Sequence, residues 1–358
     1  MKRYDLAVIA GDGVGKEVMQ EAVKVLSAIS DLTGNIDFKL NFYDYGCEYY
    51  LKTGVMMEKD GLKKLEQHDA ILLGAVGYPN VPDHISLRDL LLKIRQGFNQ
   101  YVNLRPIKLL PHVNGPLAGK GPDEIDMVFI RENTEGEYAG SGGIQSVGGV
   151  DTLAVQTSIF TRETTKKTME YAFEYSRKRN KEKKLTSITK SNALNHSMVF
   201  WDSLFKEIAS GYADIRTEEL HVDAASMFLV QKPERFDVVV ASNLFGDIMT
   251  DVGAALQGGL GFAAGANLNP EKKFPSMFEP VHGSAPDIAG KGIANPIAMI
   301  WSIKMMLDFL GHEDIGEALL NSIVYALKDK AKLTPDLGGK GTTSSVGDII
   351  CRGLVKKL

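Results

Sequence analysis

The chain has 358 residues, a formal net charge of −4 and an apolar share of 44%. These values exclude a disordered or collagen-like chain and give no indication of a nucleic-acid or membrane partner. Because domains usually contain about 100 to 200 residues, the length predicts two lobes. The two cysteines, Cys47 and Cys351, suit neither a disulfide framework nor a zinc site, and we expect a cytoplasmic protein.

The segments up to about residue 104 alternate between strand and helix patterns. Apolar or alternating runs predict strands at 6–10, 36–42, 70–76 and 101–107. Apolar residues at helical spacing predict helices at 14–29 and 87–98. This order is typical of an α/β fold.

A change of pattern near residue 105 indicates a second lobe. Strands are expected at 127–131, 153–160, 185–189, 215–221 and 238–241, and a glycine-rich stretch covers 136–149. Beyond Gly258 we expect a long loop, a short strand at 277–281 and helices at 295–311, 313–331 and 343–357.

The first glycine cluster, Gly11-Asp12-Gly13-Val14-Gly15-Lys16, lies between a strand and a helix, where phosphate-binding loops occur. The dinucleotide pattern G-x-G-x-x-G requires glycine at position 16, which is Lys16, and the P-loop pattern is also absent. The segment is therefore either a tight turn or part of a dinucleotide site without the Rossmann fingerprint.

Two aspartates give a stronger signal. Asp247 and Asp251 share one helical face of segment 244–256, where like charges repel. We expect a cation there, and oxygen ligands suit Mg²⁺ or Mn²⁺, with Asp223 as a third carboxylate. The alternative is that Asp247 caps the helix and Asp251 is solvated.

Three arginines at the ends of predicted elements suit a di- or tricarboxylate if they converge, although spacing alone also allows surface ion pairs. They are Arg95, Arg105 and Arg131. Lys190 ends a strand and Tyr138 lies in a glycine-rich segment, so each is either structural or part of a general acid/base pair.

The basic run 177–184 supports a different class of function, an RNA-binding or scaffold protein. The run lacks interleaved aromatic residues, and basic residues also suit a helix C-terminus. We therefore place this hypothesis behind an enzyme.

Six segments taken together resemble the β-decarboxylating dehydrogenases, the family of isocitrate, isopropylmalate, homoisocitrate and tartrate/D-malate dehydrogenases. They are GDGVGKEV, LLKIRQGFNQYVNLRP, RENTEGEY, TKSNAL, NLFGDIMTDVGAAL and EPVHGSAPDIAGKGIANPIA, and they span essentially the whole chain. The resemblance implies an α/β isocitrate/isopropylmalate dehydrogenase-like fold with two lobes around a large mixed sheet. Residues 1–104 and 256–358 would form a large, cofactor-binding lobe, and residues 105–255 a small lobe for dimerisation that carries the catalytic lysine and the metal-binding aspartates.

The resemblance also implies roles for individual residues. Tyr138 and Lys190 correspond to the catalytic acid/base pair, and Lys190 and Asp223 come from the partner subunit of an obligate homodimer. The metal ligands are Asp223, Asp247 and Asp251. The residues implied for substrate binding are Arg95, Arg105 and Arg131, with Leu91 and Leu92 lining a pocket. The residues implied for cofactor binding are Glu279, His282, Gly283, Ser284, Ala285, Asp287 and Asn295.

The reaction implied is a metal-dependent oxidative decarboxylation. We expect NAD rather than NADP, because Asp287 can accept hydrogen bonds from ribose hydroxyls and repels a 2′-phosphate. The strings VPDHISL and RENTEGEY favour the tartrate/D-malate branch, which predicts D-malate as substrate, pyruvate and CO₂ as products, and tartrate as a second substrate. Arg88-Asp89 departs from the Trp-Gly of that branch, so 3-isopropylmalate, from leucine biosynthesis, is the alternative. A requirement for K⁺ stays open.

Overall fold

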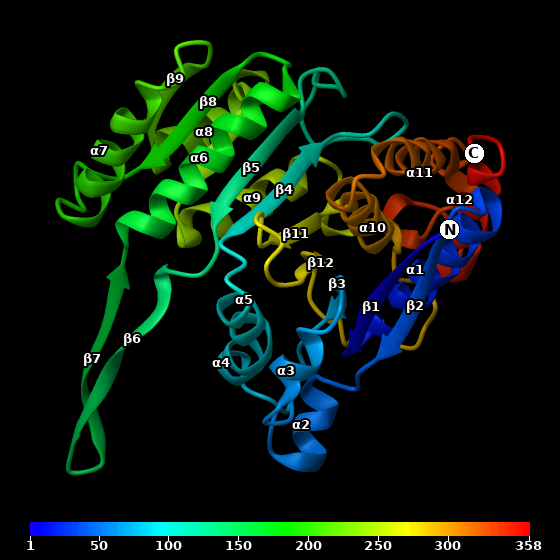
Figure 1. Cartoon of the computed structure of the whole chain (residues 1–358), viewed down its shortest axis with the longest axis horizontal. Helices are drawn as coiled ribbons and strands as arrows, with labels where there is room; N and C mark the ends of the chain where they lie inside the picture. The colour runs from blue at the N-terminus through cyan, green and yellow to red at the C-terminus, as the bar shows by residue number, and fades with distance from the viewer. The chain divides into compact units, whose positions relative to one another are not determined.

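The computed structural model describes residues 1–358. The chain divides into two compact units, and the first is assembled from both ends of the chain (Figure 1). Unit 1 comprises Met1–Gln100, Leu109–Ala118 and Ala254–Leu358, and unit 2 comprises Tyr101–Lys108 and Gly119–Gly253.

Unit 1 is built on five strands. Their order is β2 (Ile36–Phe42), β1 (Lys2–Gly11), β3 (Ala70–Ala75), β12 (Ser276–Pro280) and β11 (Ala264–Leu268). β11 is antiparallel to β12, whereas the pairs β1–β2, β1–β3 and β3–β12 are parallel. All six residues of β3 are buried, as expected for a central parallel strand with a continuous apolar sequence.

The long helices of unit 1 follow the predicted amphipathic segments. They are α1 (Val14–Thr33), α10 (Ile297–Leu310), α11 (Glu313–Ala326) and α12 (Thr343–Leu354). α1 packs on β3 and on α12, and α10 packs on β11 and β12. No helix of the chain combines the length and the apolar character that crossing a bilayer requires.

Short helices complete unit 1. They are α2 (Cys47–Thr53), α3 (Gly61–Leu65), α4 (Asp83–Ser86) and α5 (Lys93–Gly97), with single 3-10 turns at Leu260–Phe262, Lys330–Lys332 and Pro335–Leu337. The single helix expected at 87–98 is instead a π-helical stretch, Leu87–Leu92, that continues into α5. The strand β11 lies where only a loop was expected, because its five residues are too few to give a periodic signal.

The first glycine cluster forms a tight turn. The buried carboxylate of Asp12 accepts hydrogen bonds from two backbone amides at the start of α2, at 2.9 and 3.1 Å, and from the amide of Gly77 at 3.1 Å. Gly13 has a φ of 54°, and a Cβ on it would lie 2.1 Å from the carbonyl oxygen of Ser284. Because Val14 donates its amide to that same oxygen at 2.9 Å, the turn holds the loop that follows β12.

Unit 2 is built on a second set of five strands. Their order is β4 (Val102–Lys108), β5 (Asp126–Glu132), β10 (Val238–Ala241), β8 (Lys184–Thr189) and β9 (Arg216–His221). β4 is antiparallel to β5, and the other neighbours are parallel. The helices of this part are α6 (Arg162–Arg179), α7 (Ser197–Ala209), α8 (Val222–Gln231) and α9 (Asn243–Leu256), with a 3-10 turn at Pro233–Arg235.

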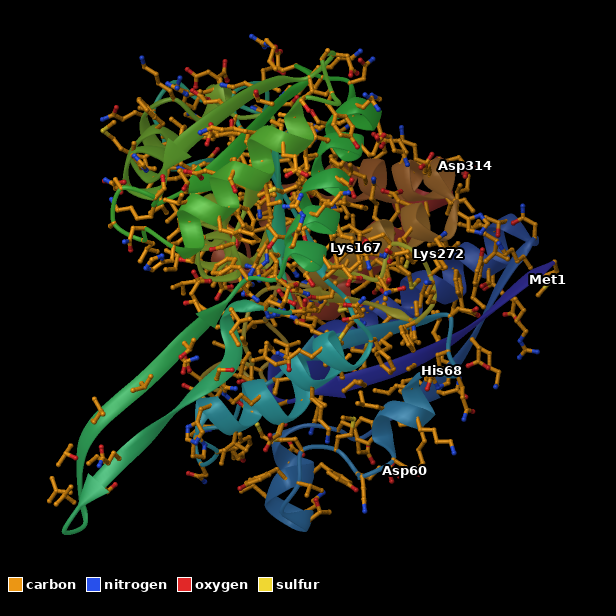
Figure 2. The ribbon with its side chains drawn as sticks, turned by 60° about the vertical axis from the view of Figure 1, so that its left-hand side comes forward. Met1, Asp60, His68, Lys167, Lys272 and Asp314 are labelled. Carbon is orange, nitrogen blue, oxygen red and sulfur yellow. The ribbon has the colours of Figure 1, made fainter.

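A two-stranded ribbon extends from unit 2 as a narrow arm (Figures 1 and 2). It consists of β6 (Gly136–Val147) and β7 (Val150–Ile159), which pair only with each other. The sequence indicated only a glycine-rich stretch at β6, because the outer part of the ribbon has no buried face to impose an alternating pattern. Every residue of β7 is exposed.

The basic run 177–184 begins in the last turn of α6, reaches the first residue of β8 and is largely ion-paired within unit 2. Arg177 contacts Asp214 at 2.7 Å, and Arg179 contacts Asp237 at 2.8 Å. Much of the positive charge is therefore balanced by carboxylates of the same unit, which gives no support to RNA binding through this run.

Candidate active site

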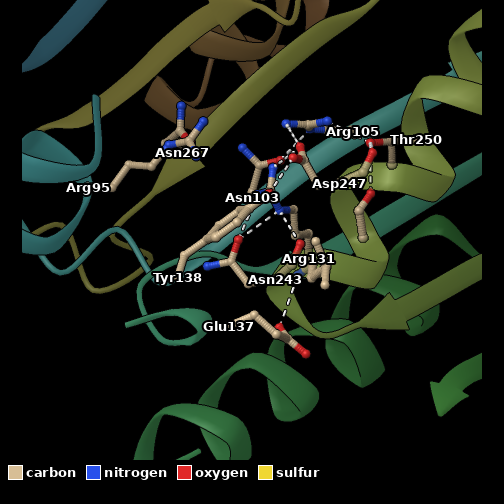
Figure 3. Close-up of polar contacts among 12 residues, drawn as sticks. Arg95, Asn103, Arg105, Arg131, Glu137, Tyr138, Asn243, Asp247, Thr250 and Asn267 are labelled. Carbon is tan, nitrogen blue, oxygen red and sulfur yellow. Dashed lines mark hydrogen bonds and ion pairs between the residues drawn. The ribbon is translucent and has the colours of Figure 1, made fainter. Parts of the chain in front are cut away.

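A cluster of polar side chains in unit 2 surrounds Asp247 (Figure 3). One carboxylate oxygen accepts from Arg131 at 2.6 Å and from Arg105 at 3.3 Å, and the other accepts from the hydroxyl of Tyr138 at 2.8 Å. The guanidinium of Arg131 also lies over the ring of Tyr138, 5.4 Å from its centre. The elements α9, β4, β5 and β6 thus bring together a predicted metal ligand, two predicted substrate-binding arginines and the predicted catalytic tyrosine.

Neutral side chains hold the two arginines in place. Asn243, at the start of α9, accepts from Arg131 through its side-chain oxygen at 2.6 Å and its carbonyl oxygen at 2.8 Å. Asn103 and Thr250 each accept from Arg105 at 2.6 Å. Both arginines are almost completely buried, with exposed fractions of 5% or less. Their orientation is therefore set before any ligand binds, which favours recognition of a planar carboxylate.

Reasoning from the sequence did not single out these neutral side chains. Asn243 carried one usable signal, since an asparagine before an apolar helical segment is a common helix start. Asn103 and Thr250 have no such signal, because their importance comes from the register of β4 against β5 and from the rotation of α9.

Helix α9 is fixed at its N-terminus by a carboxylate next to the tyrosine. Glu137 accepts from the amide of Leu244 at 3.2 Å, and its other oxygen accepts from the hydroxyl of Ser242 at 3.4 Å (Figure 3). An anion is favourable at this end of a helix because the first amide groups lack partners there. The same short segment therefore carries Tyr138 and anchors the helix that carries Asp247.

Asp251 lies one helical turn after Asp247, as the spacing predicted. Desolvation raises the pKa of Asp251, and the nearby charge of Asp247 adds to this effect, although Arg105 and Arg131 act in the opposite direction. No group of three or more His, Cys, Asp or Glu side chains of the chain is arranged to hold a metal ion. Two carboxylates of this kind nevertheless fit Mg²⁺ or Mn²⁺, which often take one or two carboxylates and fill the other positions with water or substrate oxygens.

Lys190 and Asp223 form a separate ion pair. Their charged atoms are 3.0 Å apart, and the side chains are 26% and 67% exposed. The hydrogen bond from Lys190 lowers the pKa of Asp223. Large apolar side chains near them in sequence are also exposed: Leu194 is 41% and Met227 is 46% exposed. The pair thus lies on a partly apolar surface.

In unit 1, the third predicted arginine is buried against an acidic partner. Arg95, in α5, donates to Glu279 of β12 at 2.8 Å, and Asn267 donates to the same carboxylate oxygen at 2.7 Å. The Nε atom of Arg95 has no hydrogen-bond partner. Of the two leucines predicted to line a pocket, Leu92 is buried and Leu91 is half-buried against the core of unit 1.

The predicted dinucleotide loop follows β12 and is attached to the start of α1. Besides the contact of Ser284 with α1, the amide of Gly290 donates to the carboxylate of Glu17.

The other residues predicted for cofactor binding have different surroundings. Burial lowers the pKa of His282. Gly283 and Asp287 are exposed, whereas Ala285 is half-buried with a φ of 41°. The side chain of Asn295 accepts from the amide of Ile297 and donates to Asp336, both at 3.0 Å.

Comparison with known proteins identifies the family of the chain. The profile of the isocitrate/isopropylmalate dehydrogenase family matches residues 5–350. The D-malate dehydrogenase (decarboxylating) of Escherichia coli is 50% identical over 364 residues, covering 99% of this chain and all of that protein. The probable tartrate dehydrogenase/decarboxylase of Bacillus subtilis is 48% identical over 357 residues, covering 99% of both.

A solved structure gives the same result for the fold. The isocitrate dehydrogenase of Methylococcus capsulatus superposes with a TM-score of 0.88 at 33% identity, covering 98% of this chain and 99% of that one. The predicted α/β fold class is confirmed by this match and by the mixed strand order in both units. The chain therefore belongs to the isocitrate/isopropylmalate dehydrogenase family and is an oxidative decarboxylating dehydrogenase.

Proposed function

We propose that the protein oxidises and decarboxylates D-malate to pyruvate and CO₂ with NAD as hydride acceptor and Mg²⁺ or Mn²⁺ as metal, and that it also oxidises tartrate. The observation that carries this proposal is the convergence of Arg105, Arg131 and Tyr138 on Asp247. Two buried guanidiniums suit a dicarboxylate, and relatives named for D-malate and tartrate share about half of the sequence.

The residues have separate tasks in this reaction. Arg105 and Arg131 bind substrate carboxylate, and we propose the same role for Arg95. When bound, NAD supplies the hydride acceptor and the divalent metal, held by Asp247 and Asp251, supplies a Lewis acid for the C2 carbonyl. We propose that Leu91 and Leu92 border the C3 side of the substrate.

Two proton transfers complete the chemistry. Lys190, acting as the neutral amine once it is released from its ion pair with Asp223, takes the proton of the C2 hydroxyl as hydride leaves C2. Loss of CO₂ then breaks the bond between C3 and its carboxylate and leaves an enolate, and Tyr138 donates its hydroxyl proton to C3. The hydrogen bond from Tyr138 to Asp247 supports this assignment, because it places the hydroxyl beside the proposed metal ligand.

We further propose a homodimer in which Lys190 and Asp223 serve the site of the partner subunit. Two observations support this. The Lys190–Asp223 pair lies on an exposed, partly apolar surface, and the arm carries exposed apolar side chains on both strands. Those of the arm include Ile144, Val147, Val150, Leu153 and Val155. Exposed apolar side chains that follow one another along two paired strands are typical of an association surface.

For the cofactor, we propose that Glu279, His282, Gly283, Ser284, Ala285, Asp287 and Asn295 contact NAD. Asp287 is exposed and its carboxylate is available to ribose hydroxyls. It would repel a 2′-phosphate, so KM should be much higher for NADP than for NAD. A cytoplasmic location stays a prediction, and a requirement for K⁺ stays open.

The test is a substrate panel. The ratio kcat/KM is measured for D-malate, L-tartrate and 3-isopropylmalate with NAD and Mn²⁺, and repeated after treatment with EDTA. We expect D-malate to be preferred, tartrate to be oxidised, and all activity to disappear with the metal. A preference above about tenfold for 3-isopropylmalate would overturn the substrate assignment, since one apolar substituent in a pocket accounts for discrimination of about that size.

A further inference from the structure

Glu132 is a buried carboxyl group that the proposed mechanism does not use. It is the last residue of β5, directly after Arg131, and its exposed fraction is 1%. One carboxylate oxygen accepts three hydrogen bonds from the turn that follows: from the amide of Thr134 at 2.7 Å, from the hydroxyl of Thr134 at 3.0 Å and from the amide of Glu135 at 2.9 Å.

The second oxygen of Glu132 is unusual. It is buried and has no hydrogen-bond partner. It faces Gly136, where a Cβ would lie 3.5 Å from this oxygen and 3.3 Å from the Cβ of Asn243. An unpartnered buried oxygen costs free energy, and it is rare in folded proteins unless something else requires the group.

The turn held by Glu132 joins two residues of the cluster. Arg131 precedes it, and Tyr138 follows two residues after Gly136, which has a φ of 65°. Asn243 encloses the turn from the other side, because its side-chain amide donates to the carbonyl of Glu135 at 3.1 Å. The backbone between Arg131 and Tyr138 is therefore fixed from within by Glu132 and from α9 by Asn243.

We propose that Glu132 is a positioning residue for proton transfer: its carboxylate fixes the turn 133–136 and thereby holds the hydroxyl of Tyr138 beside Asp247, in the position from which it donates a proton. The proposal rests on the proposed function, because it assigns to Glu132 an effect on the step performed by Tyr138. Because burial raises the pKa of Glu132 to about 7, the group is an ionised acceptor above that pH, and hydrogen bonds to a charged acceptor are shorter and stronger than those to a neutral one.

A purely structural role for the same carboxyl predicts a different outcome. If Glu132 only stabilised the fold, its substitution would act equally with or without the Tyr138 hydroxyl, and the two effects would add. If Glu132 acts through Tyr138, its substitution has little further effect once that hydroxyl is gone.

The experiment is a double-mutant cycle in kcat for D-malate, with variants Glu132→Gln and Tyr138→Phe and the combination of both. We expect Glu132→Gln to lower kcat about tenfold with KM changed less than about twofold, the pattern of an interaction needed in the transition state. In the Tyr138→Phe background, Glu132→Gln should change kcat by less than about twofold. Glu132→Ala removes the acceptor completely and should lower kcat further than Glu132→Gln.

The matched control is Glu135→Gln. The carboxylate of Glu135 belongs to the same segment but bonds to Thr161 and Thr164 at the start of α6, so kcat should stay within about twofold. Additive effects in the cycle, or a change in KM alone, would overturn the inference. Failure of the proposed function is a distinct result, in which the unmodified protein forms no NADH with any of the three acids.

Discussion

Two groups of predicted site residues lie in the same unit but in contrasting surroundings. Around Asp247, two almost fully buried arginines and a tyrosine meet one carboxylate, and every donor has a defined acceptor. Lys190 and Asp223 pair only at the surface, where Asp223 is 67% exposed. The first group is preorganised within one chain, whereas the second has the exposure expected of residues that act on another surface.

The buried group around Asp247 and the exposed Lys190–Asp223 pair can therefore perform two different functions, which a single cluster would otherwise have to combine. Substrate recognition and proton donation require fixed geometry, which burial provides. A proton acceptor that works in the site of another subunit must stay accessible until the subunits associate. We therefore expect substitutions in either group to reduce catalysis strongly, and only substitutions in the buried group to affect folding.

The largest effect is expected at the centre of the buried group. Asp247→Asn removes the proposed metal ligand and the shared acceptor of Arg105, Arg131 and Tyr138. We expect kcat/KM for D-malate to fall by at least about 1000-fold, equivalent to about 4 kcal/mol of transition-state stabilisation. Steady-state kinetics with Mn²⁺ give the measurement, with Glu135→Gln as control. A loss of kcat/KM smaller than about tenfold would show that Asp247 is not a central catalytic group.

A smaller effect is expected at Glu132, next to the buried group, on the pH dependence of the free energy of unfolding. Burial raises the pKa of Glu132 from 4.5 to about 7, and Glu135 adds to the rise, although hydrogen bonds from Thr134 and Glu135 oppose it. Because the pKa is higher in the folded state, the stabilising contribution is complete below about pH 4.5 and is lost as the pH rises through 7.

The corresponding measurement compares Glu132→Gln with the unmodified protein. The free energy of unfolding in urea, relative to that of the variant, should fall by about 3 kcal/mol between pH 4.5 and pH 8. A difference that is constant over this range, or that grows with pH, would show that Glu132 is ionised throughout.

The smallest effect is expected from the exposed pair. Lys190→Met should leave the midpoint of urea unfolding nearly unchanged, because an ion pair this exposed contributes little. Asp223→Asn is the matched variant and should behave alike. A clear fall of the midpoint in either variant would remove the contrast with the buried group.

The sequence predicted the parts of the fold that repeat a pattern. The spacing of Val14, Val18, Val25 and Ile29 located α1, and the apolar run at β3 located a buried strand. Prediction from the sequence failed where burial does not impose a regular spacing of apolar residues. β6 lies in an exposed arm, β11 is short, and the helix expected at 87–98 contains a π-helical stretch that leaves the apolar residues in place.

For the site, the sequence predicted Asp247 and Asp251 on one helical face, because that depends only on local geometry. Convergence of Arg105 and Arg131 on Asp247 depends on strand register and could not be read from spacing. Glu132 carried a weak signal, a charged residue at the end of an apolar strand, but only the structure gives its burial and its three hydrogen bonds to the turn.

A catalytic site that is built from two chains can be tested by complementation. Lys190→Met and Asp247→Asn are each expected to be inactive alone. When the two variants are co-expressed, each mixed dimer should hold one site with an intact Asp247 from one chain and an intact Lys190 from the other. Random assembly of a symmetric dimer then restores about a quarter of the activity of the unmodified protein.

The control is co-expression of Lys190→Met with a chain that carries both substitutions, since no combination of those chains supplies both residues. The account predicts activity in the first mixture and none in the control. If the first mixture is as inactive as its parents although mixed dimers are isolated from it, Lys190 and Asp247 act within a single chain and the two-chain site is contradicted.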